Sequence, residues 1–450
     1  MQALLADGRL TPGVRVPSER DLAAALGVGR GTVAAAYERM RASGHLVRRR
    51  GSGTWTATPT EAPPLPFTPA PSPAGTIDLA HAAPTAPAEA VTEAGHAALA
   101  ALPAHLCSAG YDVVGLSALR EAVADRLADE GLPTHPDEVL ITSGSQHAHS
   151  LVARALVRPG DRVVLDQPTY PNAIGLVHDS SARPVPVSLE RSDDGTLDWD
   201  VRALAAALRE STPATAYLVA DQHNPTGAVM GAATREGVVD AFRRHGVPIV
   251  VDDSLRDTWI DAPPPPCLGS FAGPRSESTV ITIGSLSKTV WAGLRIGWLR
   301  APRALVRRIA TTRASDDVAP PVLGQLMALA LLERHDELAA TNRARLRAGR
   351  DHLLRALPAA LPDWSVRRPG GGMALWADLG APRSSALAEA APRHGLVLAS
   401  GPRFGVGGAF ESRLRVPYTL PLDVLDDAVV RLAATWDDLD RAPSVLTTVV

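Results

Sequence analysis

Short apolar runs alternate with helical patterns between residues 116 and 300, and polar clusters follow the runs at their carboxyl ends. The expected strands cover residues 138–142, 162–165, 216–219, 248–251 and 279–283. Continuous apolar strands separated by helices predict a mostly parallel sheet with both faces covered. Open α/β sheets bind ligands at the carboxyl ends of their strands. The sequence therefore predicts an α/β fold with a ligand site along that edge.

The regions around this sheet indicate a multidomain chain. Residues 330–440 are more helical and predict a smaller α+β lobe, with strands at 364–367, 373–378 and 413–417. Residues 58–75 are rich in proline, which suits neither a helix nor a central strand, so an interdomain linker is expected. A proline-rich recognition motif is the weaker alternative. The expected domains are residues 1–57, the linker 58–75, and 76–448, with a large lobe at about 120–325 and a small lobe at about 76–119 and 326–448.

The first 57 residues show the pattern of a small DNA-binding domain. Ser18, with Asp21 three residues later, predicts the start of a helix that Gly27 ends. A second helix opens near Arg30, and residues 33, 37 and 40 are its apolar face. Strands at 45–50 and 54–57 follow, joined by a Gly-Ser-Gly turn. Helix, turn, helix and β-wing form a DNA-binding arrangement.

Charge supports this interpretation. Residues 1–56 hold nine arginines against four acidic residues, a balance of +5, which leaves −8 for the rest of a chain with net charge −3. A basic domain on an acidic body indicates that one part meets a polyanion. A solvated basic face is the alternative that charge alone leaves open.

The composition also excludes several classes of protein. No apolar run reaches the roughly 18 residues of a spanning helix, and the first residues lack the pattern of a secretion signal. Cys107 and Cys267 lie far apart without CxxC spacing, so neither a disulfide framework nor a metal site is expected. A reducing cytoplasm is the expected location.

One residue count points to chemistry. Of the 45 lysines and arginines, Lys288 is the single lysine. Arginine keeps its proton, whereas lysine can lose it and attack a carbonyl group. In a chain that otherwise uses arginine, this residue is the first candidate for such a reaction. The alternative is that the lysine remains by chance and has no special role.

The residues around Lys288 are those expected near a phosphorylated aromatic ring. Ser285, Ser287 and Arg295 suit a phosphate, as does the predicted helix start at Ser145 and Gln146. Asp252, at another strand end, could pair with a protonated pyridine nitrogen. Tyr170 could cover a ring, and Asn224 could bond to a phenolic oxygen. Tyr170 and Asn224 could each instead be a local turn or core residue.

These segments resemble the fold-type I, aspartate-aminotransferase-like family of pyridoxal-phosphate proteins. The matching motifs are YDVVGLSALR (111–120), ITSGSQHA, DQPTYPNA, NPTG, VVDD, SLSK and GLRIG, in the family's order. The resemblance implies pyridoxal 5'-phosphate as cofactor, with Lys288 as the catalytic lysine that carries it. The cofactor-binding residues it implies are Lys288, Ser145, Gln146, Tyr170, Asn224, Asp252, Ser285, Ser287, Arg295 and, toward the partner subunit of a dimer, Tyr111.

The resemblance further implies that Arg415 binds a ligand carboxylate, with Arg413 as the competing candidate on the same strand face. One departure concerns Ser254, which stands where the family's tyrosine near the cofactor's 3′-oxygen is expected. Serine is too short for that role, so weak or absent transaminase activity is expected.

The first 57 residues resemble the winged helix of GntR-type regulators, through PSER, GVGRGTV and RRGSGTW. A GntR-type head fused to an aminotransferase-like body is typical of the MocR-like subfamily. This implies a PLP-dependent DNA-binding transcription regulator, a homodimer that senses an amino acid or amine as an external aldimine. A working aminotransferase and a sensor of pyridoxal phosphate itself are the alternatives. The residues implied to contact operator DNA are Arg20, Arg30, Thr32, Arg48, Arg49, Arg50, Ser52 and Gly53.

Overall fold

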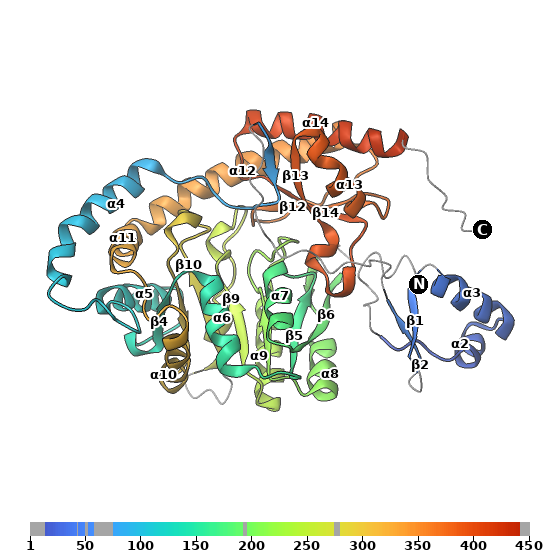
Figure 1. Cartoon of the computed structure of the whole chain (residues 1–450), viewed down its shortest axis with the longest axis horizontal. Helices are drawn as coiled ribbons and strands as arrows, with labels where there is room; N and C mark the ends of the chain where they lie inside the picture. Colours follow the sequence, from blue (N-terminus) through green and yellow to red (C-terminus); the bar gives the residue numbers. More distant parts are fainter. Residues whose placement is uncertain are drawn as a thin grey trace.

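A computed structural model describes residues 14–42, 44–49, 53–57, 75–191, 196–273 and 280–441. These residues form a small helical domain with a hairpin and a larger body built on two sheets (Figure 1). Residues 1–13 of the expected N-terminal domain and nearly all of the predicted linker lie outside the described residues. In the part of the chain that is described, no helix is both long and apolar enough to cross a membrane.

The N-terminal domain has the predicted helix-turn-helix with a hairpin. Helix α2 (Glu19–Leu26) begins after Ser18, whose side chain accepts a hydrogen bond from the Asp21 amide, and ends at Gly27 with φ of 64°. Helix α3 (Arg30–Ala42) follows, and β1 (Leu46–Arg49) pairs antiparallel with β2 (Gly53–Thr56). The apolar residues predicted on one face of α3, Val33, Tyr37 and Met40, are buried in a common core with Val16, Ala23 and Leu46.

Within the described residues, eight strands form the large sheet, in the order β4-β11-β10-β9-β8-β5-β6-β7. The neighbours from β10 to β6 pair in parallel, whereas β11 and β7 run antiparallel to their neighbours. The sheet is therefore mostly parallel, as predicted. Its strands are β4 (Val139–Thr142), β5 (Arg162–Gln167), β6 (Arg183–Arg191), β7 (Leu197–Trp199), β8 (Thr215–Leu218), β9 (Ile249–Asp252), β10 (Val280–Ser285) and β11 (Gly297–Arg300).

Helices cover both faces of this sheet (Figure 1). One face packs against α6, α7 and α10, and the other against α8 and α9, while α4, α5 and α11 pack beside β4. Successive side chains along a strand point to opposite faces of the sheet. The neighbours Leu140 and Ile141 therefore pack in different apolar clusters. The helices are α4 (Ala88–Ala101), α5 (Ser117–Asp129), α6 (Ser145–Leu156), α7 (Pro171–Asp179), α8 (Val201–Ser211), α9 (Ala232–His245), α10 (Arg303–Thr312) and α11 (Val322–Leu332).

The small lobe is a second sheet with the order β12-β14-β13-β3 and helices packed on it. Strand β3 (Ile77–Leu79), which follows the predicted linker, pairs in parallel with β13. The other elements are α12 (His335–Ala360), β12 (Ala374–Asp378), α13 (Ser384–Ala390), β13 (Leu396–Ser400), β14 (Arg413–Pro417) and α14 (Leu422–Arg441).

Short 3₁₀ helices connect these elements. They are η1 (Leu102–His105), η2 (Pro136–Glu138), η3 (Arg256–Thr258), η4 (Leu268–Ala272), η5 (Ala292–Leu294), η6 (Arg313–Ser315), η7 (Ala391–His394), η8 (Gly401–Phe404) and η9 (Val406–Gly408).

One predicted strand is wrong. Residues 364–367 form no strand, and there Ser365 makes only an isolated bridge with Asp378. Trp364 is buried in the small lobe without being part of a strand, and its ring centroid lies 5.3 Å from that of Trp436. The residue limits of the lobes stay a prediction: β3 joins the small sheet, whereas α4 packs in a cluster with α5 and α11.

Candidate functional site

A cavity lies at the carboxyl ends of β8, β9 and β10, where small-lobe residues meet the large sheet. Its empty volume is about 1160 Å³, which includes its opening to solvent. The cavity therefore lies at the edge of the sheet where a ligand site was predicted. The predicted site residues that line it are Ser145, Tyr170, Asn224, Asp252, Lys288 and Arg415.

Lys288 reaches the cavity from the turn that follows the fully buried strand β10. Its Nζ donates a hydrogen bond to the Ala82 carbonyl at 2.8 Å. The backbone carbonyl of Lys288 accepts a hydrogen bond from the Asn342 side-chain amide at 3.0 Å. Burial, and then the positive charge of Arg415, lower the pKa of the Lys288 amine from 10.5 to about 8. A lysine with such a pKa has a substantial neutral, nucleophilic fraction near neutral pH.

Asp252 ends β9 and is buried. Its Oδ2 accepts hydrogen bonds from His149 Nε2 and Tyr217 Oη, both at 3.0 Å, and its Oδ1 accepts one from the Ser254 amide at 2.9 Å. Burial by itself raises the pKa of this carboxyl group, but His149 and the other donors outweigh it and lower the pKa to about 2. The carboxylate is therefore ionised at neutral pH and suits a cationic N–H partner.

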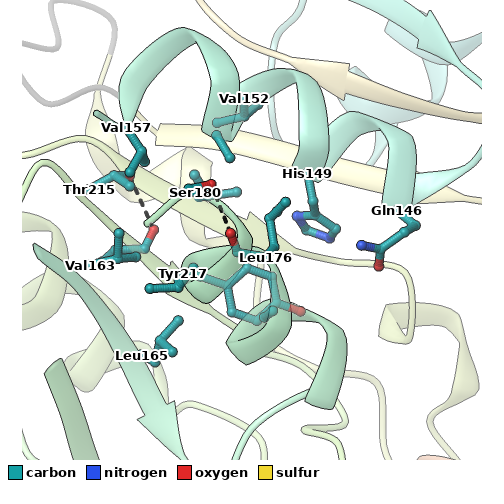
Figure 2. Close-up of a pocket in the computed structure, with 15 residues that line it drawn as sticks. Gln146, His149, Val152, Val157, Val163, Leu165, Leu176, Ser180, Thr215 and Tyr217 are labelled. Atoms are coloured by element: carbon teal, nitrogen blue, oxygen red, sulfur yellow. Dashed lines mark hydrogen bonds between the residues drawn. The ribbon is translucent and has the colours of Figure 1, made fainter. Parts of the chain in front are cut away.

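His149 and Tyr217 were not among the predicted site residues. Both line a second, mostly apolar cavity of about 490 Å³ (Figure 2), and Tyr217 lines the first cavity as well. Their rings meet edge to face with centroids 5.0 Å apart, and aliphatic side chains surround them. Burial raises the pKa of Tyr217 well above 10, so its phenol stays a donor. One signal could have identified His149: it lies one helical turn after Ser145, on the same side of α6.

The start of α6 forms a cradle that has room for backbone only. Gly144 has φ of +90°, and a Cβ on it would lie 2.6 Å from Arg295 Nη2. A Cβ on Gly297 would lie 2.8 Å from the amide nitrogen of Ser145. Arg295 Nη2 also donates to the Ser143 carbonyl at 3.0 Å, so this arginine lies against the helix start. A helix N-terminus with an adjacent arginine suits a phosphate group.

Besides Arg295, four other predicted cofactor residues do not line the cavity. Ser285 and Ser287 are buried with their hydroxyls 2.8 Å apart, and Ser285 also donates to the Ile296 carbonyl. Gln146 lines the second cavity, and its buried Oε1 has no hydrogen-bond partner among the described residues. The side chain of Tyr111 lies outside both cavities, with 74% of the residue exposed.

The structure separates the two arginines proposed for a ligand carboxylate. Arg413 pairs with Asp378 at 2.9 Å, whereas Arg415 lines the cavity and is only 6% exposed. Arg415 Nη1 donates to Asn224 Oδ1 at 3.4 Å, and Nη2 donates to the Ala80 carbonyl. Its Nε is buried without a hydrogen-bond partner in the described part of the chain. Arg415 is thus the better placed of the two.

Tyr170 lines the cavity from the start of α7 and accepts a hydrogen bond from the Asn172 side chain at 2.8 Å. Burial raises its pKa to about 12, so the phenol is neutral. Ser254 and Leu255 also line the cavity, and neither carries a phenol. The lysine amine with its lowered pKa, the ionised carboxylate and the glycine cradle together fit pyridoxal phosphate.

The proposed DNA-contacting residues of the N-terminal domain lie on its surface where they are described. Arg20 and Thr32 are exposed near the starts of α2 and α3, and Arg48 is exposed on β1. Arg30 begins α3, with 74% of its side chain exposed and Glu19 at 3.6 Å. Gly53 begins β2 with φ of +97°. The side chain of Arg49 and all of Arg50 and Ser52 lie outside the described residues.

Two family models match the chain. The model for class I and II aminotransferases matches residues 75–432, and the model for bacterial regulatory proteins of the gntR family matches residues 1–55.

Individual relatives share one or both parts. YisV of Bacillus subtilis, an uncharacterized HTH-type transcriptional regulator, is 26% identical over 417 residues, which cover 84% of this chain and 82% of YisV. NorG of Staphylococcus aureus, an HTH-type transcriptional regulator, is 24% identical over 393 residues, which cover 81% of this chain and 86% of NorG. Among solved structures, LysN from Thermus thermophilus, an alpha-aminoadipate aminotransferase, has a TM-score of 0.74 and 26% identity. The match covers 82% of this chain and 94% of LysN.

Proposed function

The chain belongs to the class I and II aminotransferase family, and since a gntR-family regulatory domain precedes this part, we propose that it is a transcription regulator that binds an amino compound at a pyridoxal-phosphate site. The N-terminal domain would bind an operator in double-stranded DNA, and the body would hold the cofactor and the effector. We further propose a homodimer in the cytoplasm, in which Tyr111 reaches the partner subunit's site.

The observation that carries the proposal is Lys288, the single lysine of the chain, which is partly buried and lines the same cavity as the ionised Asp252. When bound, pyridoxal phosphate supplies an aldehyde that joins amines covalently and a ring that withdraws electrons. Lys288 would hold it covalently, and Asp252 would accept a hydrogen bond from the ring nitrogen and keep a proton there. The α6 cradle with Arg295 would bind the phosphate, and Tyr170 would cover the ring.

The effector would be held by groups that the cofactor does not use. Arg415 would bind its carboxylate through Nε, which has no partner among the described residues. Asn224, already in contact with Arg415, would orient that guanidinium and bond to the cofactor's ring oxygen. An effector changes DNA binding only if it binds two arrangements of the protein unequally. The effector amine would compete with Lys288 for the cofactor and could supply that difference.

The test is the absorbance spectrum of the purified full chain with added pyridoxal phosphate. We expect a visible band in the wild type that is absent in Lys288→Ala, while both proteins retain the same circular dichroism. Amino compounds that shift the band would then be tested for their effect on DNA binding by the wild type. A band of equal strength in Lys288→Ala would refute the assignment of the lysine.

A working aminotransferase is the second candidate, because Lys288, Asp252 and Arg415 all meet in one cavity and LysN shares the fold. It predicts steady keto-acid production from an amino acid donor, whereas the regulator predicts spectral shifts with little turnover. A sensor of pyridoxal phosphate itself predicts that the cofactor alone changes DNA affinity. DNA-binding curves with and without cofactor and amino compound distinguish the three.

A further inference from the structure

Two apolar clusters contribute to the lining of the cavity around Lys288. The first consists of Ala80, Ala399 and Phe404, which are buried together and all line the cavity. The ring of Trp376 packs against this cluster, with its centroid 5.4 Å from that of Phe404. This part of the lining is therefore supported by a second aromatic ring and offers no hydrogen-bonding side chain.

The second cluster is the core of the small lobe, which reaches the cavity through Met373, Leu255 and Ala82. Met373 is buried in this core, while Leu255 and Ala82 are partly buried and pack against it. Because Ala80, Ala82 and Ala399 carry only a methyl group, the two clusters leave room between a bulky side chain and the backbone. Apolar surface of this kind gains free energy when a ligand removes it from water.

The charged side chains of the lining have other tasks. The proposed function assigns Asp252 and Lys288 to the cofactor and Arg415 to the carboxylate of the effector. Arg403 and His81 also line the cavity, but both interact with other groups of the chain. An effector side chain therefore meets no charge in the described lining that is left over for it.

The remaining polar side chains offer little more. Gln222 and His223 line the cavity but are each only 1% exposed, and burial lowers the pKa of His223 to about 3, so it is neutral. The Asn172 side-chain amide donates to Tyr170. A charged side chain buried in such surroundings is costly, whereas an apolar one is favourable.

We propose that the effector is an α-amino acid with a large apolar side chain, between leucine and phenylalanine in size, that packs against these two clusters. This rests on the proposed function. The guanidinium carbon of Arg415 lies 4.9 Å from the centroid of the Phe404 ring, so a carboxylate held by Arg415 lies close to the first cluster. Burying a side chain of this size should make binding about 10- to 100-fold tighter than that of L-alanine.

The experiment titrates the cofactor-loaded full chain with four amino acids and follows the cofactor's absorbance. L-norleucine and L-phenylalanine should bind about tenfold or more tightly than L-alanine. L-glutamate, which is close to L-norleucine in length, should bind about tenfold or more weakly than L-norleucine because its side-chain charge is buried.

A pair of variants locates the side chain of the effector. Ala82→Met fills part of the room beside the second cluster, so the ratio of the Kd of L-alanine to that of L-norleucine should fall several-fold. Ala128→Met makes the same change at an exposed position of α5 and should keep the wild-type ratio.

The outcomes separate this inference from the proposed function. A cofactor band that responds to L-alanine or L-glutamate at concentrations as low as for L-norleucine and L-phenylalanine, or that responds to none of the four, refutes the apolar effector and leaves cofactor binding intact. An unchanged ratio in folded Ala82→Met refutes the role of the second cluster. Absence of any cofactor band in the wild type refutes the proposed function itself.

Discussion

The lowered pKa of Lys288 makes covalent capture of pyridoxal phosphate depend on pH in a defined way. Burial and the charge of Arg415 lower the pKa from 10.5 to about 8. At pH 7 the neutral fraction is then ~10%, against ~0.03% for an unperturbed lysine. Because a less basic amine is also a weaker nucleophile, capture should be faster than by an exposed lysine by less than this ratio of about 300. The rate should rise with pH and level off above a midpoint near 8.

The assay mixes protein and pyridoxal phosphate between pH 6 and 10, quenches with borohydride, and measures the label by mass spectrometry. Since Lys288 is the single lysine of the chain, peptide mapping needs to separate it only from the terminal amine. Lys288→Ala is the control and should carry no label in this region.

Two variants should move the midpoint in opposite directions. Arg415→Gln removes a positive charge that lowers the pKa of Lys288, so the midpoint should rise. Asp252→Asn removes a negative charge that raises this pKa, so the midpoint should fall. A wild-type midpoint near 10, or shifts of the same sign in both variants, would refute the reasoning.

Three further predictions concern the carboxylate, the cradle and the DNA-binding surface. Tyr217→Phe keeps the ring but removes a donor to Asp252, so the cofactor should dissociate roughly tenfold more readily, measured by dialysis and absorbance; unchanged retention would contradict this. Gly297→Ala places a Cβ 2.8 Å from the backbone of the cradle, so it should lower the stability by about 1–3 kcal/mol and remove much of the bound cofactor. The control is Gly175→Ala, whose Cβ has nothing within 4 Å and should lower the stability little. Thermal unfolding of the two variants makes the comparison. Arg48→Ala should lower the slope of log binding constant against log salt concentration by about one unit, measured in operator titrations at several salt concentrations. Arg30→Ala should weaken operator binding by about 1–3 kcal/mol and relax its specificity, measured in titrations with operators of altered sequence.

The large sheet could be predicted because its strands are continuous apolar runs. The expected strand at 248–251 and the observed β9 differ by one residue, and all four residues of β9 are buried. Strands β6, β7 and β11 were not predicted, and Pro184 and Pro186 interrupt the pattern of β6. The structure shows why they are tolerated: β7 pairs only with residues 189–191 of β6, so the prolines lie where that side of the strand is a sheet edge.

The site was predictable where a residue sits at a strand end or in a motif, as Asp252 and Lys288 do. The residues that were missed act through side-chain contacts across the chain. His149 is 103 residues from Asp252, and Tyr217 is 35 residues from it. The spacing of His149 from Ser145 puts it on the same side of α6, but neither bond to Asp252 follows from the sequence, because each depends on how α6 and β8 lie against β9.

Strand β3 has a mechanical consequence. It is the first described element after the linker region, and it is hydrogen-bonded in parallel to β13, with Arg431 also donating to the Gly75 carbonyl. Directly after it, the Ala80 carbonyl accepts from Arg415. The tether to the N-terminal domain is thus anchored in the small lobe and not in the large sheet. Any hinge motion of the small lobe displaces that anchor point, so the N-terminal domain can respond to the angle between the lobes without touching the ligand.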